Sequence, residues 1–349
     1  MDKTPQASVA PVEHKVSRRN MAKVKNDSNE RERLIKSGLN FILEFGKHIQ
    51  FESDLERRKE VMAEVLHCIF FLGHIHKNPV PPESFFTTEE NIQQYKELFP
   101  RAFQQYANHL PTRTPFSILL ALVLRRNGST NSKAILNSLA QIKKALQDND
   151  QAENNYTLTA TVITECYLKE EGQKRFYGAS LSCSGGVETR VMIALSCIQT
   201  WNEAVAHAVW NTEKKRKGYI RFPKDVFCTA YKIDPESDSY VTIAPCSKCY
   251  TIFTGVTFKP PFSGERDSER FRFGNCAETE SLSHLLDAEK NVRNETRAYL
   301  SGKEVTVDRA SIIKDAKLKA KELLGPRHFE ITGDIFKFFP VTMNGLPEV

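Results

Sequence analysis

The chain has 349 residues, of which 40% are hydrophobic and 26% are charged. This composition is typical of a soluble globular protein and excludes collagen-like, coiled-coil and wholly disordered chains, and the length allows two domains that each bury a core. Lysine and arginine outnumber aspartate and glutamate by 49 to 43, which gives a net charge of +6. This mild excess permits a polyanionic partner without requiring one.

The sequence lacks segments that predict export or a membrane span. The longest uncharged apolar stretch, residues 115–124, is about half as long as a bilayer requires, and the N-terminal residues lack the apolar run of a secretory signal. We therefore expect the eight cysteines to lie in a reducing compartment, as buried thiols or metal ligands. The expected location is the cytoplasm or the nucleus, with no membrane partner.

The first half of the chain predicts a tail followed by helices. Residues 1–29 are basic and contain few large apolar side chains, which indicates a disordered tail. Residues 30–147 have helical spacing: apolar pairs recur every four residues around positions 61, 65 and 69, and prolines at 79, 81 and 82 end that helix. We expect an all-helical bundle here. It contains no chemical constellation, and binding of a protein partner is one possible role.

The second half predicts a different architecture. Residues 148–155 are polar and indicate a linker, and residues 156–349 alternate between strand and helix patterns, as in an α/β domain. Strands are expected at 176–183, 219–222, 226–231, 240–244, 303–307 and 335–341. Long helices are expected at 187–210 and 309–324, with a further helix beginning near Cys276.

Two cysteine motifs each follow an extended segment and precede a predicted helix. One is Pro-Cys-Ser-Lys-Cys, with thiols at Cys246 and Cys249, and the other is Cys-Ala-Glu, with Cys276 and Glu278. The free N–H groups and the positive dipole end of a helix start favour thiolate, which is the form that binds metal. Glu278 lies close enough to Cys276 to reach a metal-bound water without being a ligand itself.

This pair of motifs resembles the signature of the zinc-dependent cytidine and nucleic-acid deaminase superfamily, in which His or Cys, any residue, then Glu accompanies Pro-Cys-x-x-Cys. The family places the Glu motif first, whereas here it comes second, so the resemblance implies a permuted three-layer α/β/α fold within residues 176–349. It further implies Zn²⁺ bound by Cys246, Cys249 and Cys276. Glu278 would then be the acid and base in hydrolytic deamination of a nucleobase, in a nucleotide or a nucleic acid.

Neighbouring residues are candidates for substrate contacts. Asn275 could contact sugar or base, or it could cap the following helix. Phe273 and Tyr250 could stack on a base, and so could Phe271. The alternation of Phe271 and Phe273 favours instead one core-facing side of a strand.

Basic residues near the motifs have two expected roles. Lys248 or Arg272 could donate hydrogen bonds to a ligand sulfur. The run Lys-Lys-Arg-Lys at 214–217 is typical of a cationic helix C-terminus, with a nuclear address or a phosphate contact as alternatives.

Three other functions remain open from the sequence. The cysteines could form a structural zinc module, closed by a fourth ligand such as His284, and a closed site cannot activate water. A strand followed by Cys-x-x-Cys at a helix start is also the arrangement of thiol–disulfide oxidoreductases, although that function leaves Cys276 and Glu278 unexplained. The chain could also be an interaction protein with an inactive deaminase-like half.

Overall fold

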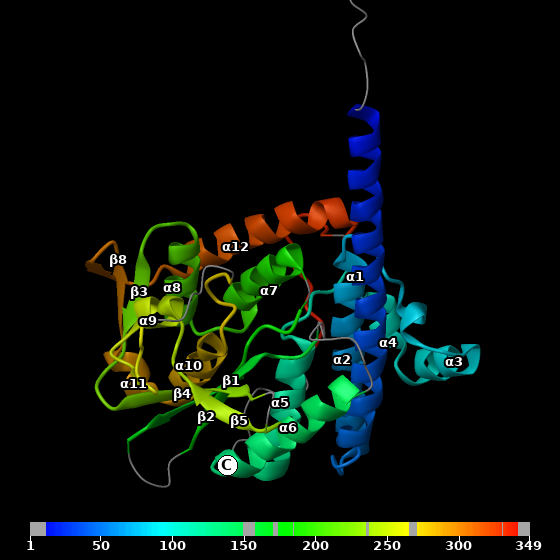
Figure 1. The fold of residues 1–349 in the computed structure, drawn as a ribbon. Helices are drawn as coiled ribbons and strands as arrows, with labels where there is room; N and C mark the ends of the chain where they lie inside the picture. Colours follow the sequence, from blue (N-terminus) through cyan, green and yellow to red (C-terminus); the bar gives the residue numbers. More distant parts are fainter. Residues whose placement is uncertain are drawn as a thin grey trace, which may run out of the picture.

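The computed structural model describes residues 12–148, 158–169, 174–183, 185–234, 237–264, 271–329 and 331–340, with the backbone alone for 12–28 and 147–148. The fold is mixed α/β, with an N-terminal helical half beside two mixed β-sheets (Figure 1). Within this described part, none of the helices has the length and apolarity of a membrane span.

The helical half begins with a helix that is longer than the composition predicts. Its elements are α1 (Val12–Ile49), α2 (Leu55–Ile75), the 3-10 helix η1 (Pro82–Phe85), α3 (Glu89–Leu98), α4 (Pro100–Gln105), α5 (Pro115–Asn127) and α6 (Ser132–Asp148). The backbone of residues 12–29 is helical, whereas a disordered tail is predicted there; residues 1–11 lie outside the described part. No glycine or proline interrupts the sequence between Pro11 and Gly38, so a helix fixed by Phe41 and Phe45 in the core can extend towards the N-terminus.

The α/β half alternates short strands and helices. Its elements are β1 (Val162–Leu168), β2 (Phe176–Ala179), α7 (Gly186–Gln199), α8 (Glu203–Glu213), β3 (Gly218–Arg221), β4 (Val226–Ile233), β5 (Tyr240–Ile243), α9 (Ser247–Ile252), β6 (Phe253–Thr254), β7 (Thr257–Lys259), α10 (Ala277–Ala288), α11 (Lys290–Glu295), β8 (Arg297–Leu300), β9 (Lys303–Val305), α12 (Arg309–Leu324) and the 3-10 helix η2 (Gly325–Arg327). The predicted linker falls mostly on residues outside the described part.

Two predictions in this half are wrong. The expected helix 187–210 is two helices, because the side chain of Asn202 accepts the backbone N–H of Ala204 and starts α8 as its N-cap. The expected strand 335–341 makes only an isolated bridge, between Phe338 and Leu110, and residue 341 is outside the described part. Strands β1, β6, β7 and β8 fall outside all of the predicted strands.

The strands form two sheets that are connected through the short segment between β6 and β7. One sheet has the order β2-β1-β4-β5, with β7 also paired to β4, and the other has the order β6-β3-β8-β9. Strand β7 is parallel to β4, and β6 is parallel to β3. Only Gly255 and Val256 separate β6 from β7, so the two sheets continue into one another through this segment.

Helices cover one side of the strands and part of the other. Helix α8 contacts both α9 and α10, so the three helices form one layer. Helix α8 packs on β3 and β8, and α10 packs on β1 and β2. On the opposite side, Ser132 of α6 bonds to Glu165 of β1 and to Tyr177 of β2, and α6 also contacts β5. Helix α5 contacts the edge strand β2. Figure 1 shows α8 beside β3, α10 above β4 and β2, and α5 and α6 to the right of β5.

The two halves share one continuous hydrophobic core. The backbone N–H of Phe116 donates to the hydroxyl of Ser182 over 3.1 Å. Near the C-terminus, the backbone N–H of Phe339 donates to the carbonyl of Leu110 over 2.9 Å, and the Phe339 ring stacks on His67 with 4.1 Å between centroids. The α/β half is therefore packed against the helical half along several elements.

We predict that a side chain at Gly178 destabilises the fold. A Cβ there would lie 2.4 Å from the carbonyl oxygen of Ala277 and 2.4 Å from the backbone nitrogen of Ser281, where α10 packs on β2. Gly178→Ala should lower the free energy of unfolding by about 2 kcal/mol, measured by urea titration. The control Gly46→Ala has open space and should raise it by about 0.5 to 1 kcal/mol. Equal stability of parent and Gly178→Ala would contradict this packing.

A second prediction concerns acid stability. His67 is fully buried, and desolvation lowers its pKa from 6.5 to about 3. The unfolded chain therefore binds one more proton between those values, so stability is complete above pH 6.5 and falls as the pH drops towards 3. His67→Gln should remove on the order of 2 kcal/mol of the stability difference between pH 7 and pH 4.5, measured by urea unfolding at both values. Identical pH dependence in parent and variant would refute it.

Candidate metal centre

Three cysteine thiols from two motifs meet in one cluster. The sulfur atoms of Cys246, Cys249 and Cys276 all lie within 4.8 Å of one another, and those of Cys246 and Cys276 are 3.4 Å apart. All three side chains are buried or half-buried. Within the described residues, this is the group of His, Cys, Asp or Glu side chains whose geometry suits a metal ion.

Two helix starts position these thiols. Cys246 is the N-cap of α9, and its sulfur accepts the backbone N–H of Cys249 over 3.4 Å. Cys276 is the N-cap of α10 and has extended backbone angles. Because both residues precede the first helical turn, their side chains project beside free backbone N–H groups, where negative charge is favoured.

The segment before Cys276 is held from two sides. Gly274 has a φ of +89°, and a Cβ there would lie 2.9 Å from both Trp201 and Val209. The carbonyl of Asn275 accepts the backbone N–H of Leu181 over 3.0 Å. The Gly-Asn pair is therefore a tight turn that delivers Cys276 to the cluster, as the sequence break before the predicted helix indicates.

The pKa values of the three thiols are shifted in opposite directions. Hydrogen bonds from the thiols of Cys249 and Cys276, together with backbone N–H groups, lower the pKa of Cys246 to about 2. Donation of a hydrogen bond to Cys246 raises the pKa of Cys249 and of Cys276 well above the usual value, and burial adds to this. Metal binding must therefore displace protons from the latter two thiols, so it should weaken as the pH falls.

Glu278 lies in the first turn of α10 and is almost completely buried, with 2% of its surface exposed. Its negative charge contributes to the raised pKa of Cys249, of Cys276 and of Cys228. The start of α10 thus carries both Cys276, as its N-cap, and this carboxylate in its first turn. This places the predicted acid and base beside the predicted ligands.

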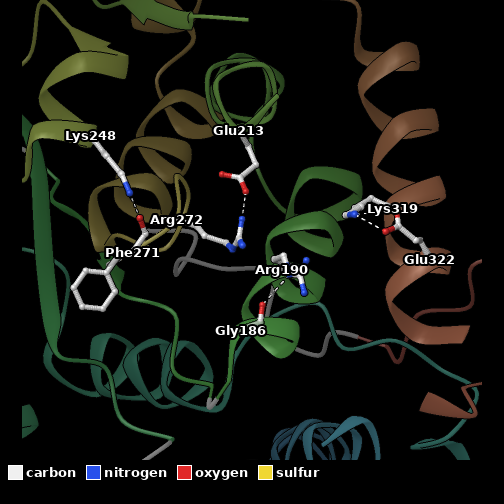
Figure 2. A network of polar contacts seen from close by, with 8 residues as sticks. All are labelled: Gly186, Arg190, Glu213, Lys248, Phe271, Arg272, Lys319 and Glu322. Carbon is white, nitrogen blue, oxygen red and sulfur yellow. Dashed lines mark hydrogen bonds and ion pairs between the residues drawn. The ribbon is translucent and has the colours of Figure 1, made fainter. Parts of the chain in front are cut away.

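The proposed fourth ligand and the two proposed sulfur donors have other partners. The Nδ1 atom of His284 lies 2.9 Å from the carbonyl oxygen of Tyr177, and His284 is not part of the thiol cluster. Lys248 donates to the carbonyl of Phe271, and Arg272 forms an ion pair with Glu213 (Figure 2). These three sequence-based expectations are therefore wrong, since each side chain is used to fix a loop or a helix instead.

The candidate substrate contacts differ in exposure. Phe271 is 55% exposed and does not lie in a strand, so the core-facing strand favoured for Phe271 and Phe273 is wrong. Phe273 is half-buried, with the Lys248 ammonium 5.4 Å from its ring centroid. Tyr250 is 51% exposed and stacks on Phe262 at 4.5 Å between centroids. Asn275 is half-buried, and the N-cap of α10 is Cys276, not Asn275.

Polar contacts hold α10 against β1, and the sequence pattern does not predict them. The hydroxyl of Ser281 lies 2.8 Å from that of Thr164 and 3.0 Å from the sulfur of Cys166. Cys166 is in turn directly opposite Cys228 across β1 and β4, with 3.0 Å between the sulfurs. These residues anchor the helix that carries Glu278. These contacts depend on strand β1, because its register with β4 places Cys166 and Cys228 opposite each other on the side that α10 covers.

The donor set suits a soft metal ion, because three thiolates prefer ions such as Zn²⁺ to Mg²⁺ or Ca²⁺. Comparison with known proteins adds no relative: no family model, no curated protein and no solved structure matches this chain. The inference that this chain can bind a metal ion therefore rests on the geometry of the three cysteines.

We predict that the purified protein binds one metal ion per chain through this cluster. Cys249→Ala should lose most of the bound metal, because it removes one of three ligands, as measured by elemental analysis of the purified protein. Cys183→Ala is the matched control, since this half-buried thiol lies outside the cluster and contacts Thr189. Equal metal content in the two variants would show that the cluster is not the binding site.

Proposed function

We propose that the chain is a zinc-dependent hydrolytic deaminase of a nucleobase, in a nucleotide or in a nucleic acid. One observation carries the proposal. Three thiols gather at the starts of two helices, and a buried glutamate from one of these helices lies within electrostatic reach of them. The same residues form the Pro-Cys-x-x-Cys and Cys-x-Glu motifs that resemble the deaminase superfamily.

Cys246, Cys249 and Cys276 would hold the ion. When bound, zinc supplies a Lewis acid that lowers the pKa of a coordinated water to near 7. Three thiolates outweigh the charge of Zn²⁺ and weaken this effect, but the N–H groups at the starts of α9 and α10 offset part of the excess. The described residues supply no fourth His, Cys, Asp or Glu ligand, which favours an open coordination position over a closed structural site.

Glu278 would move the protons. Deamination adds water at the amine-bearing carbon of cytosine or adenine and releases ammonia. The carboxylate takes one proton from the water, passes it to the ring nitrogen and then helps to protonate the leaving amine. Burial suits this task, because the side chain is held at the start of α10 and shielded from bulk water.

The reversed order of the motifs is compatible with this chemistry. The family's first motif and second motif each occupy a helix start, and a metal centre built from two such ends is independent of which helix comes first in the chain. Here α9 follows β5, and α10 packs on β1 and β2. We include a permuted deaminase-like fold in the proposal, with the cytoplasm or nucleus as the expected location and a protein partner of the helical half as a further possibility.

A thiol–disulfide oxidoreductase is the second candidate function. The depressed pKa of Cys246 in the Cys-x-x-Cys pair favours a nucleophilic thiolate. However, Cys276 supplies a third sulfur only 3.4 Å from Cys246, and a dithiol mechanism has no use for it. An inactive, metal-bound interaction protein would also retain the cluster, so activity has to be measured directly.

The test measures metal binding and deamination separately. We predict that the parent releases ammonia from cytosine- or adenine-containing nucleotides or oligonucleotides, and that Glu278→Gln lowers the rate by at least about 100-fold while metal content stays unchanged. Cys249→Ala should lose both. The control Glu280→Gln changes the next glutamate of α10, which bonds to the backbone N–H of Ala179 and not to the thiols, and it should keep its metal and most of its rate.

Other results would assign the site differently. Stoichiometric zinc without turnover in the parent, across both substrate classes, would indicate a structural or interaction protein. Absence of zinc together with a titratable dithiol at Cys246 and Cys249 would indicate the oxidoreductase.

A further inference from the structure

The side of the sheets opposite α8, α9 and α10 is only partly covered. Helix α6 reaches its near end, where Ser132 bonds to Glu165 and to the hydroxyl of Tyr177. The outward-facing residues of β7 and of the second sheet remain exposed or half-exposed, including Thr257 and Arg221. We call this remaining area the open sheet face. It is defined by Tyr167, Arg175, Tyr219, Arg221, Phe227, Lys259 and Tyr299.

One group of these residues spans β1, β4 and β7. Tyr167 and Phe227 face each other across the strands, with ring centroids 5.6 Å apart. The Lys259 ammonium lies 4.3 Å from the Phe227 centroid, and the Arg175 guanidinium lies 4.4 Å from that of Tyr167. Both rings are half-exposed and Lys259 is exposed. Two aromatic rings are therefore flanked by two cations at the surface.

A second group repeats this chemistry on β3 and β8. Tyr219 and Tyr299 are directly paired and stack with 4.7 Å between centroids, at an interplanar angle of 2°. The Arg221 guanidinium lies 5.2 Å from the Tyr299 centroid. Both strands alternate, so that Gly218, Ile220 and Ala298 are buried on the α8 side. The two tyrosines therefore face away from α8, as Phe227 faces away from α10, and α8 and α10 contact each other.

Further cationic side chains border this face. The Lys-Lys-Arg-Lys run is the turn between α8 and β3: Lys214 pairs with Asp315, whereas residues 215–217 are exposed and lead directly into Tyr219. The hydroxyl of Ser301 donates to the carbonyl of Arg216 and joins this turn to the end of β8. Acidic groups are also present, since Arg175 pairs with the buried Glu165 and Arg297 lies 3.6 Å from Glu304.

We propose that the open sheet face binds single-stranded nucleic acid. Half-exposed rings offer stacking surfaces to unpaired bases of any sequence, and neighbouring lysine and arginine side chains neutralise the phosphates. A double helix hides the faces of its bases, so this face should prefer single strands. An acidic protein segment would satisfy the cations alone and leave the two ring pairs without a role.

The binding face is independent of the proposed metal chemistry. It belongs to the side of the sheets opposite α9 and α10, which carry the thiols and Glu278. If both proposals hold, the face gives the proposed deaminase a polymeric substrate or a nucleic-acid anchor. Binding should therefore survive in Glu278→Gln, and failure of one proposal can be told from failure of the other.

The experiment is a fluorescence anisotropy titration of the full chain with labelled 20-nucleotide oligo-thymidine and oligo-uridine, at several salt concentrations. The parent should bind with a Kd on the order of micromolar near physiological salt, and a hairpin duplex should bind more weakly. Phe227→Ser and Tyr299→Ser should each weaken binding about tenfold with little change in salt dependence. Arg221→Glu and Lys259→Glu should weaken binding and lower the salt slope by about one or two.

Lys319→Glu is the matched charge control. It makes the same change of charge on α12, where Lys319 pairs with Glu322 (Figure 2). Helix α12 packs on α7 and α8 and not on the open sheet face. It should retain nearly the parent's affinity, and thermal melting of each variant checks that it is folded. The proposal is overturned if the parent does not bind either oligonucleotide, if folded face variants bind like the parent, if duplex binds as tightly as single strands, or if Lys319→Glu loses as much affinity as Arg221→Glu.

Discussion

The close contact between α10 and the β1–β2 hairpin is the constraint on which the rest of the site depends. Gly178 lets the backbone of α10 approach β2, and Ser281 fixes the helix to β1 through Thr164 and Cys166. This contact sets the position of the helix start, so it sets the positions of Cys276 and Glu278 together. The thiols of α9 can then complete the cluster only because α10 begins at that place.

The same arrangement concentrates negative charge in a poorly solvated region. The pKa of Cys246 is lowered there, whereas the pKa values of Cys249 and Cys276 are raised. Glu278 adds a further carboxylate beside them. Uncompensated charges of one sign are costly in such a place. A divalent cation is the natural counter-charge, which is a physical reason, separate from motif matching, to expect one.

The site was more predictable from the sequence than the fold around it. The cysteine spacing and the breaks before two helices were local signals, and they identified the three thiols that the structure brings together. The partners of His284, Lys248 and Arg272 depend on which loop or helix lies opposite, and no local pattern contains that information. Strand β1 is buried on both sides and β8 has only four residues, so neither gives a clear alternating pattern, and the cross-strand pairs that depend on them could not be anticipated.

The open sheet face exists because helices cover the two sides of the sheets unequally. Helices α8, α9 and α10 cover one side of the strands, and on the other side α6 covers the part of the first sheet around Glu165 and Tyr177. An uncovered sheet face usually carries polar side chains that water can solvate. Here it carries stacked aromatic rings with cationic side chains over them. Large rings on a surface expose apolar area that solubility alone does not require. Their pairing with cations across two sheets is therefore better explained by a ligand that has both flat bases and negative charge.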